Sequence, residues 1–192
     1  MKTSYLEKGM KDLMSENYTR LLNELKGADK IVVCGLGNDM MMDDVAGLLA
    51  TNLLINMMDK MDRPKNLKVI LCGRSPENFI YLIIKEKPTH VLFVDAVDFH
   101  AKPGEVAVFS SEDVVDFFPS THALSIKFIG DLLFKEIPSL KKVIVLGIQP
   151  KKVDFGEGIS LEVKEGSMEV SKLLYRVLLN VLKKEDDTKR RK

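Results

Sequence analysis

A short β-branched run that leads straight into a glycine-containing turn and an apolar helical pattern most restricts the fold of this chain. Residues 31–33 read Ile-Val-Val, which is typical of a buried strand. Residues 34–47 carry two early glycines and the carboxylate pair Asp43 and Asp44, and apolar residues then recur at helical spacing. The pattern predicts a strand-to-helix turn at the carboxyl edge of an open parallel sheet, where such folds bind ligands.

This turn has three possible interpretations. Dinucleotide binding requires a third glycine where Met40 stands, and the nearby carboxylates would repel a pyrophosphate. In the second interpretation, Asp43 and Asp44 only cap the helix and favour its positive end. In the third, one aspartate caps while its neighbour points elsewhere and serves as a metal ligand or acid–base group. Spacing alone leaves the second and third interpretations open.

Strand patterns alternate with helical patterns along the rest of the chain. Four further strands are predicted at residues 67–72, 91–95, 105–109 and 142–147. Only about ten residues separate the second and third of these, too few for a helical crossover, so residues 105–109 should run antiparallel. The sequence therefore predicts an α/β fold, a three-layer α/β/α sandwich with a mostly parallel sheet of about five strands.

The chain divides into three parts. Residues 1–29 are predicted to form an N-terminal amphipathic helix extension, which packs on the domain or forms a contact that supports a homo-oligomer. Residues 30–182 form one domain, whose final helix we expect Ser167 to cap. Residues 183–192, with six Lys or Arg against three acids, are predicted to be a charged disordered tail.

Composition excludes several classes of function. The net charge of +1 gives no argument for a nucleic-acid partner. No apolar run approaches the roughly 20 residues that span a bilayer, and charges interrupt the N-terminus where a signal peptide would be apolar. The two cysteines do not form a disulfide framework, and Cys72 is either a buried free thiol or part of the crevice lining. We expect a soluble intracellular protein without a membrane partner.

Two further residues, Asp95 and His122, are the main remaining candidates for the site. Asp95 ends an apolar strand, and because an unpaired buried charge is costly, it is better explained as a site group at the carboxyl edge. Asp98 and His100 follow it as secondary candidates. His122 is predicted in a loop or first turn near a helix N-terminus, where a neutral, ligating or proton-accepting ring is favoured. A lone histidine at such a position is more often a solvent-exposed loop residue, so that interpretation also stays open for His122.

Asp44, Asp95 and His122 come from three connections that can converge on one crevice of the predicted sheet. Two carboxylates and an imidazole form an incomplete ligand set for a borderline divalent metal. Such a set binds a molecule that brings its own donors, or activates water. The residues alone thus indicate a hydrolase-like or metal-recognising site.

Six motifs occur in this order along the chain: Gly35-Leu36-Gly37-Asn38 with Asp43-Asp44, Ser75-Pro76-Glu77-Asn78, Pro88-Thr89-His90 leading to Val94–Asp98, Pro103-Gly104-Glu105, Thr121-His122 and Gly147-Ile148-Gln149-Pro150. In these motifs, residues 30–182 resemble the nickel–iron hydrogenase maturation endopeptidases. The resemblance is strongest to the hydrogenase 3 (formate hydrogenlyase) type. The chain departs from the pattern at Val45, where many family members have glycine.

The resemblance implies a cytoplasmic, nickel-dependent endopeptidase of aspartic type. It would remove the C-terminal extension of a nickel–iron hydrogenase large-subunit precursor after nickel insertion. By family analogy Asp44, Asp95 and His122 are the metal ligands that sense nickel, and Asp44 and Asp95 are the catalytic candidates. The nickel would arrive with the substrate, whose cysteine thiolates could fill the remaining positions. The alternative is a non-catalytic nickel-dependent checkpoint or chaperone protein that binds the same precursor.

Overall fold

The computed structural model describes residues 15–59, 64–110 and 121–189, with the side chains of 121–125 and 183–189 outside that description. The strands are β1 (Ile31–Leu36), β2 (Leu67–Gly73), β3 (His90–Ala96), β4 (Val106–Ser110) and β5 (Lys142–Ile148). The helices are α2 (Ala46–Met58), α3 (Ile80–Glu86), α5 (Thr121–Glu136) and α6 (Leu161–Lys189), with the 3-10 helices η1 (Met42–Val45) and η2 (Pro76–Phe79). Residues 15–24 are also helical.

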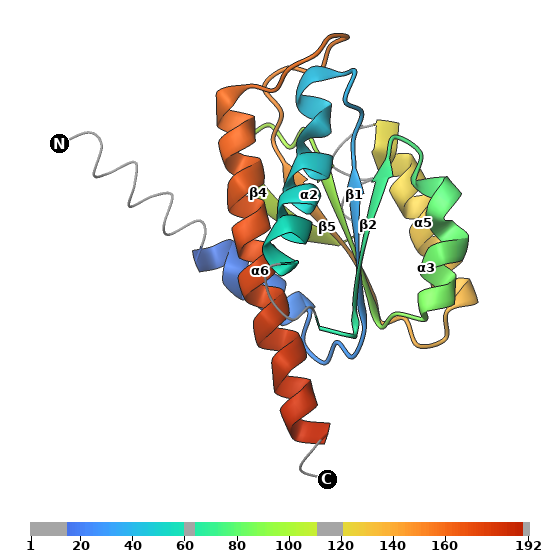
Figure 1. Ribbon diagram of the computed structural model, residues 1–192. Helices are drawn as coiled ribbons and strands as arrows, with labels where there is room; N and C mark the ends of the chain where they lie inside the picture. The colour runs from blue at the N-terminus through green and yellow to red at the C-terminus, as the bar shows by residue number, and fades with distance from the viewer. Residues whose placement is uncertain (1–14, 60–63, 111–120, 190–192) are drawn as a thin grey trace, which may run out of the picture.

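The five strands form one sheet in the order β2-β1-β3-β5-β4 (Figure 1). Strands β2, β1, β3 and β5 are parallel, and β4 pairs antiparallel with β5. The register places Asp95 of β3 opposite Gly147 of β5. The predicted mixed sheet with one antiparallel strand is therefore confirmed.

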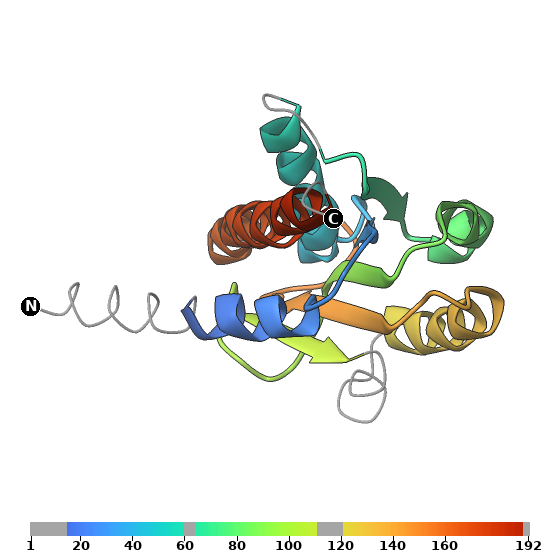
Figure 2. The same cartoon turned by 90° about the horizontal axis from the view of Figure 1, so that it is seen from below.

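Helices cover both faces of the sheet, which confirms the three-layer prediction. Helices α2 and α6 lie on one face and α3 and α5 on the other (Figures 1 and 2). Alternate residues of the central strands supply the two cores, as the pleat requires: Leu92 and Val94 face α2 and α6, whereas Val91 and Phe93 face α3 and α5. In the part of the chain that the structure describes, no helix is long and apolar enough to cross a membrane.

The described part of the N-terminal extension packs into the domain. Leu21 and Leu25 are fully buried in the core beneath α2 and α6. The Asn17 side-chain amide donates to the backbone oxygen of Val106 at 2.8 Å and so covers the edge strand β4. Residues 1–14 of the predicted extension lie outside the described residues.

Helix α6 differs from its prediction at both ends. It begins at Leu161, and Ser167 lies inside it, fully buried, with its hydroxyl donating to the backbone oxygen of Val163 at 2.9 Å. The predicted cap at Ser167 is therefore wrong. The helix also continues to Lys189, into the predicted tail, which begins at residue 183. Lysine and glutamate are good helix formers, so a helix held by its apolar stripe can extend beyond that stripe.

Candidate active site

The turn after β1 depends on a glycine for its shape. Gly37 has φ +134, a conformation that L side chains rarely adopt. A Cβ atom at Gly37 would overlap the backbone oxygen of Asp44. The turn can therefore fold directly onto η1, which places the two aspartates beside the end of β1.

A second glycine lets helix α2 approach the sheet. A Cβ atom at Gly47 would overlap the backbone oxygens of Val94 and Leu36. The start of α2 thus packs against the main chains of both β1 and β3, and η1 contacts β3 as well. Gly47 provides the close helix–strand packing that Met40 could not provide in a dinucleotide-binding turn.

Asp43 holds a distant loop in place. It is fully buried, and its Oδ2 accepts hydrogen bonds from the backbone N–H groups of Lys151 and Lys152 at 3.0 and 2.9 Å. Ser160 donates its backbone N–H to Oδ1 at 2.6 Å and its hydroxyl to Oδ2 at 2.9 Å. Asp43 therefore anchors both ends of the segment between β5 and α6.

Asp44 points elsewhere, toward the glycine turn. It is half-buried, and its Oδ2 accepts the backbone N–H of Asn38 at 2.8 Å. The N-cap of η1 is Met41 and that of α2 is Val45, and neither makes a side-chain cap hydrogen bond. The capping interpretation of the two aspartates is therefore wrong. The structure divides them in another way: Asp43 anchors a loop, and Asp44 lies at the turn.

Asp95 lies near the carboxyl end of β3. It is fully buried, and its Oδ1 accepts the backbone N–H of Ala96 at 2.9 Å. Phe93 and Val97, two residues before and after it, belong to the core beneath α3 and α5. Because side chains alternate along a strand, the carboxylate of Asp95 faces the layer that contains α5.

His122 is the second residue of α5. The far end of this helix lies at the amino end of β3, because the Ser139 hydroxyl, just past α5, contacts the backbone oxygens of Lys87 and Pro88 at 3.4 and 3.3 Å. The first turn of α5 therefore lies at the opposite edge, where the arrow of β1 ends (Figure 1). Asp95 lies at this same edge, near the carboxyl end of β3, which runs parallel to β1. The prediction of a position in the first helical turn is confirmed, while the His122 side chain lies outside the described residues.

The fold thus brings the backbone positions of Asp44, Asp95 and His122 to one edge of the sheet. Asp44 follows β1, Asp95 lies within β3, and His122 follows β4. Among the side chains that the structure describes, no three His, Cys, Asp or Glu residues form a group that could hold a metal ion. His122 is outside that set. The predicted ligand set therefore stays a prediction.

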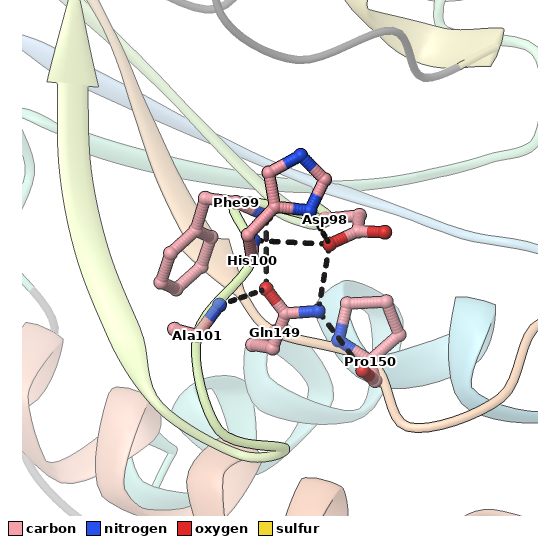
Figure 3. A network of polar contacts seen from close by, with 6 residues as sticks. All are labelled: Asp98, Phe99, His100, Ala101, Gln149 and Pro150. Carbon is pink, nitrogen blue, oxygen red and sulfur yellow. Dashed lines mark hydrogen bonds and ion pairs between the residues drawn. The ribbon is translucent and has the colours of Figure 1, made fainter.

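The secondary candidates Asp98 and His100 belong to a hydrogen-bond network around Gln149 (Figure 3). The buried Gln149 side chain accepts the backbone N–H groups of Phe99 and Ala101 through Oε1, at 2.9 and 3.1 Å. Its Nε2 donates to Oδ1 of Asp98 at 3.0 Å and to a backbone oxygen at 3.1 Å. Gln149 thereby ties the loop after β3 to the end of β5.

Asp98 and His100 are exposed members of this network. Oδ1 of Asp98 also accepts the backbone N–H of His100 at 3.1 Å, and Nδ1 of the ring lies 3.4 Å away. The amide of Gln149 lowers the pKa of Asp98, and the backbone N–H of His100 lowers it further. Both residues shape the loop that follows Asp95. No role was assigned to Gln149 from the sequence. Its position directly after a buried strand could have indicated one, because a buried side-chain amide needs hydrogen-bond partners.

A cavity of about 550 Å³ lies beside the glycine turn. Its wall includes Asn38, Asp39, Met40, Leu48, Arg74 and Asn78. Cys72 also lines it, although its side chain is mostly buried and the thiol is free. A hydrogen bond between the thiols of Cys34 and Cys72, together with burial, raises the pKa of Cys34. Both interpretations of Cys72, buried thiol and crevice lining, thus hold.

These features define a class of protein: an open-sheet α/β domain with a carboxylate-bearing crevice at the carboxyl edge, next to a glycine turn. Comparison of the chain with known proteins identifies its family within this class. The family model for HycI, hydrogenase maturation protease, matches residues 52–177, which is more than half of the chain. The chain therefore belongs to the HycI family of hydrogenase maturation proteases, and its class of activity is that of a hydrolase.

Individual relatives agree with this assignment. The chain is 36% identical to the hydrogenase 3 maturation protease of Escherichia coli over 138 residues, 70% of this chain and 81% of the relative. It is similar to the crystal structure of a [NiFe] hydrogenase maturation protease, HycI, from Thermococcus kodakarensis, with TM-score 0.70, 28% identity and coverage of 82% and 97%. The solution structure of the endopeptidase HycI from Escherichia coli gives TM-score 0.62, 30% identity and coverage of 77% and 90%.

Proposed function

We propose that this chain is a cytoplasmic endopeptidase that removes the C-terminal extension of a nickel–iron hydrogenase large-subunit precursor after nickel insertion. The observation that carries the proposal is the position of Asp44, Asp95 and the first turn of α5 at one edge of the sheet. Family membership supports the class of reaction, and the crevice beside the turn supports a substrate that enters at this edge.

The substrate's nickel would bind to Asp44, Asp95 and His122. Carboxylate oxygen and imidazole nitrogen are suitable donors for a divalent metal of this kind. Asp95 is fully buried near the carboxyl end of β3. Asp44 is half-buried, so a metal carried on another protein can approach it from solvent. Three protein ligands leave positions for the precursor's own thiolates.

Hydrolysis of the peptide bond needs a polarised carbonyl and an activated water. A bound divalent metal supplies Lewis-acid polarisation or lowers the pKa of a bound water. The protein would supply the general base, and Asp44 is the better placed carboxylate because solvent reaches it while Asp95 is buried. The backbone N–H of Asn38 holds one oxygen of Asp44 in position for this role.

A processing assay with matched variants tests the proposal. Asp44→Asn and His122→Ala should each abolish cleavage of a nickel-loaded precursor without unfolding the protein. Asp131→Asn, which neutralises an exposed carboxylate on α5, should leave cleavage at the wild-type rate. A variant of Asp44 or His122 that still processes at the normal rate would remove that residue from the site.

The same assay separates the proposal from a non-catalytic checkpoint protein. A checkpoint would bind the nickel-loaded precursor and leave its mass unchanged. A protease would release the extension as a fragment. Stable nickel-dependent binding without a fragment would therefore replace the protease proposal with the checkpoint.

A further inference from the structure

The cavity beside the glycine turn contains a cation without a protein partner in the described structure. Arg74 follows β2 directly, is exposed, and makes no hydrogen bond or ion pair with the described residues. A guanidinium presents a planar set of donors that fits a carboxylate with two parallel hydrogen bonds. Arg74 is therefore available to a ligand in this cavity.

The rest of the lining suits a peptide. Asn38 and Asn78 carry side-chain amides, which can offer donors and acceptors to a peptide backbone. In the turn itself, Oδ1 of Asn38 accepts the backbone N–H of Met40 at 3.1 Å. Leu48 and Met40 add apolar surface, and Met40 is 50% exposed. A volume of about 550 Å³ falls in the usual range of ligand-binding pockets.

The cavity adjoins the candidate active site at Asn38. This residue lines the cavity, and its backbone N–H donates to the carboxylate of Asp44 at 2.8 Å. A substrate whose scissile bond lies at Asp44 would therefore place its neighbouring residues in the cavity. Asp39 also lines the cavity and would repel a ligand's carboxylate placed beside it. An acidic group of the ligand should therefore face Arg74.

We propose that this cavity is a subsite for the C-terminal extension of the precursor, where Arg74 pairs with a carboxylate near the scissile bond. The inference rests on the proposed function and adds the chemistry that selects the substrate: an extended peptide with an acidic side chain close to the cleavage point. Arg74 acts in binding, and Asp44 keeps the catalytic role.

Steady-state processing of a nickel-loaded precursor by an Arg74→Gln variant tests the subsite. Loss of a charged hydrogen-bonded pair should raise KM by about 10-fold to 100-fold, with kcat unchanged. Arg20→Gln, which removes an exposed arginine from the N-terminal helix, serves as the matched control and should leave both constants unchanged. A KM within twofold of the wild type for Arg74→Gln would overturn the proposal.

A binding measurement separates the subsite from the proposed function. The probes are a fluorescently labelled synthetic peptide of the precursor's extension and a version with its acids replaced by amides, titrated with the full chain. The wild type should prefer the acidic peptide, and Arg74→Gln should lose that preference. Equal affinity of the wild type for both peptides would contradict the pairing. If the wild type prefers the acidic peptide but does not cleave the precursor, the result would contradict the protease function and leave the subsite standing.

Discussion

The two adjacent aspartates should differ in their contribution to stability, so Asp43→Asn should lower the free energy of unfolding more than Asp44→Asn does. The buried carboxylate accepts four hydrogen bonds, three from backbone N–H groups and one from the Ser160 hydroxyl. Asparagine keeps one acceptor oxygen. That oxygen can serve the three donors that contact Oδ2 in the wild type, which are the backbone N–H groups of Lys151 and Lys152 and the Ser160 hydroxyl. Its NH₂ group must then face the backbone N–H of Ser160, so two donors oppose each other.

The expected cost follows from those contacts. One hydrogen bond to a charged group is lost, which costs about 1.5–3 kcal/mol, and the other three lose their charge assistance. We therefore expect Asp43→Asn to lower the free energy of unfolding by about 2–4 kcal/mol. Asp44→Asn should cost about 1 kcal/mol or less, because Asp44 is half-buried and asparagine can still accept from Asn38.

Urea unfolding followed by circular dichroism measures this difference. The midpoint should fall for Asp43→Asn with the slope unchanged, and stay near the wild type for Asp44→Asn. Amide hydrogen exchange gives a local check, since protection at Lys151, Lys152 and Ser160 should decrease only in the Asp43 variant. Equal unfolding midpoints for the two variants would refute the assigned division of roles.

Two further predictions concern other parts of the fold. Gln149→Glu removes the donor to Asp98 and places a second carboxylate beside it, so it should lower the free energy of unfolding by about 1–3 kcal/mol. Adding Asp98→Asn to the same chain should recover part of this loss, as measured by urea unfolding. His90 has a pKa lowered to about 4, by burial first and then by Lys141 and Lys142. Because the unfolded ring binds a proton at higher pH than the folded one, stability should be full above about pH 6.5 and fall by at most about 3 kcal/mol toward pH 4. The urea midpoint at pH 7 and pH 4.5 measures this loss, which His90→Gln should reduce; an unchanged pH dependence in that variant would contradict the assignment.

The sheet and its layers could be predicted from the sequence because their signals are local. Apolar β-branched runs mark the strands, and the short connection before residues 105–109 requires an antiparallel strand. The carboxyl-edge positions of Asp44 and Asp95 follow from strand direction alone. His122 could be placed in a loop or first helical turn because apolar residues recur at helical spacing just after it.

The remaining features depend on contacts between distant parts of the chain. The role of Asp43 comes from residues more than a hundred positions away, and no local pattern separates it from Asp44. Ser167 resembles a helix cap, yet α6 begins earlier and Gly166 packs against the backbone of Gly104. The hydrogen bonds of the Gln149 side chain likewise join loops that meet only after the sheet has formed.

The intact mass of a large-subunit precursor tests the central claim most directly. The protein is mixed with nickel-loaded precursor and, in parallel, with nickel-free precursor. The proposed function predicts loss of a C-terminal fragment in the nickel-loaded sample only, and no loss with Asp44→Asn. An unchanged mass in the nickel-loaded sample, or equal cleavage with and without nickel, would contradict a nickel-dependent maturation protease.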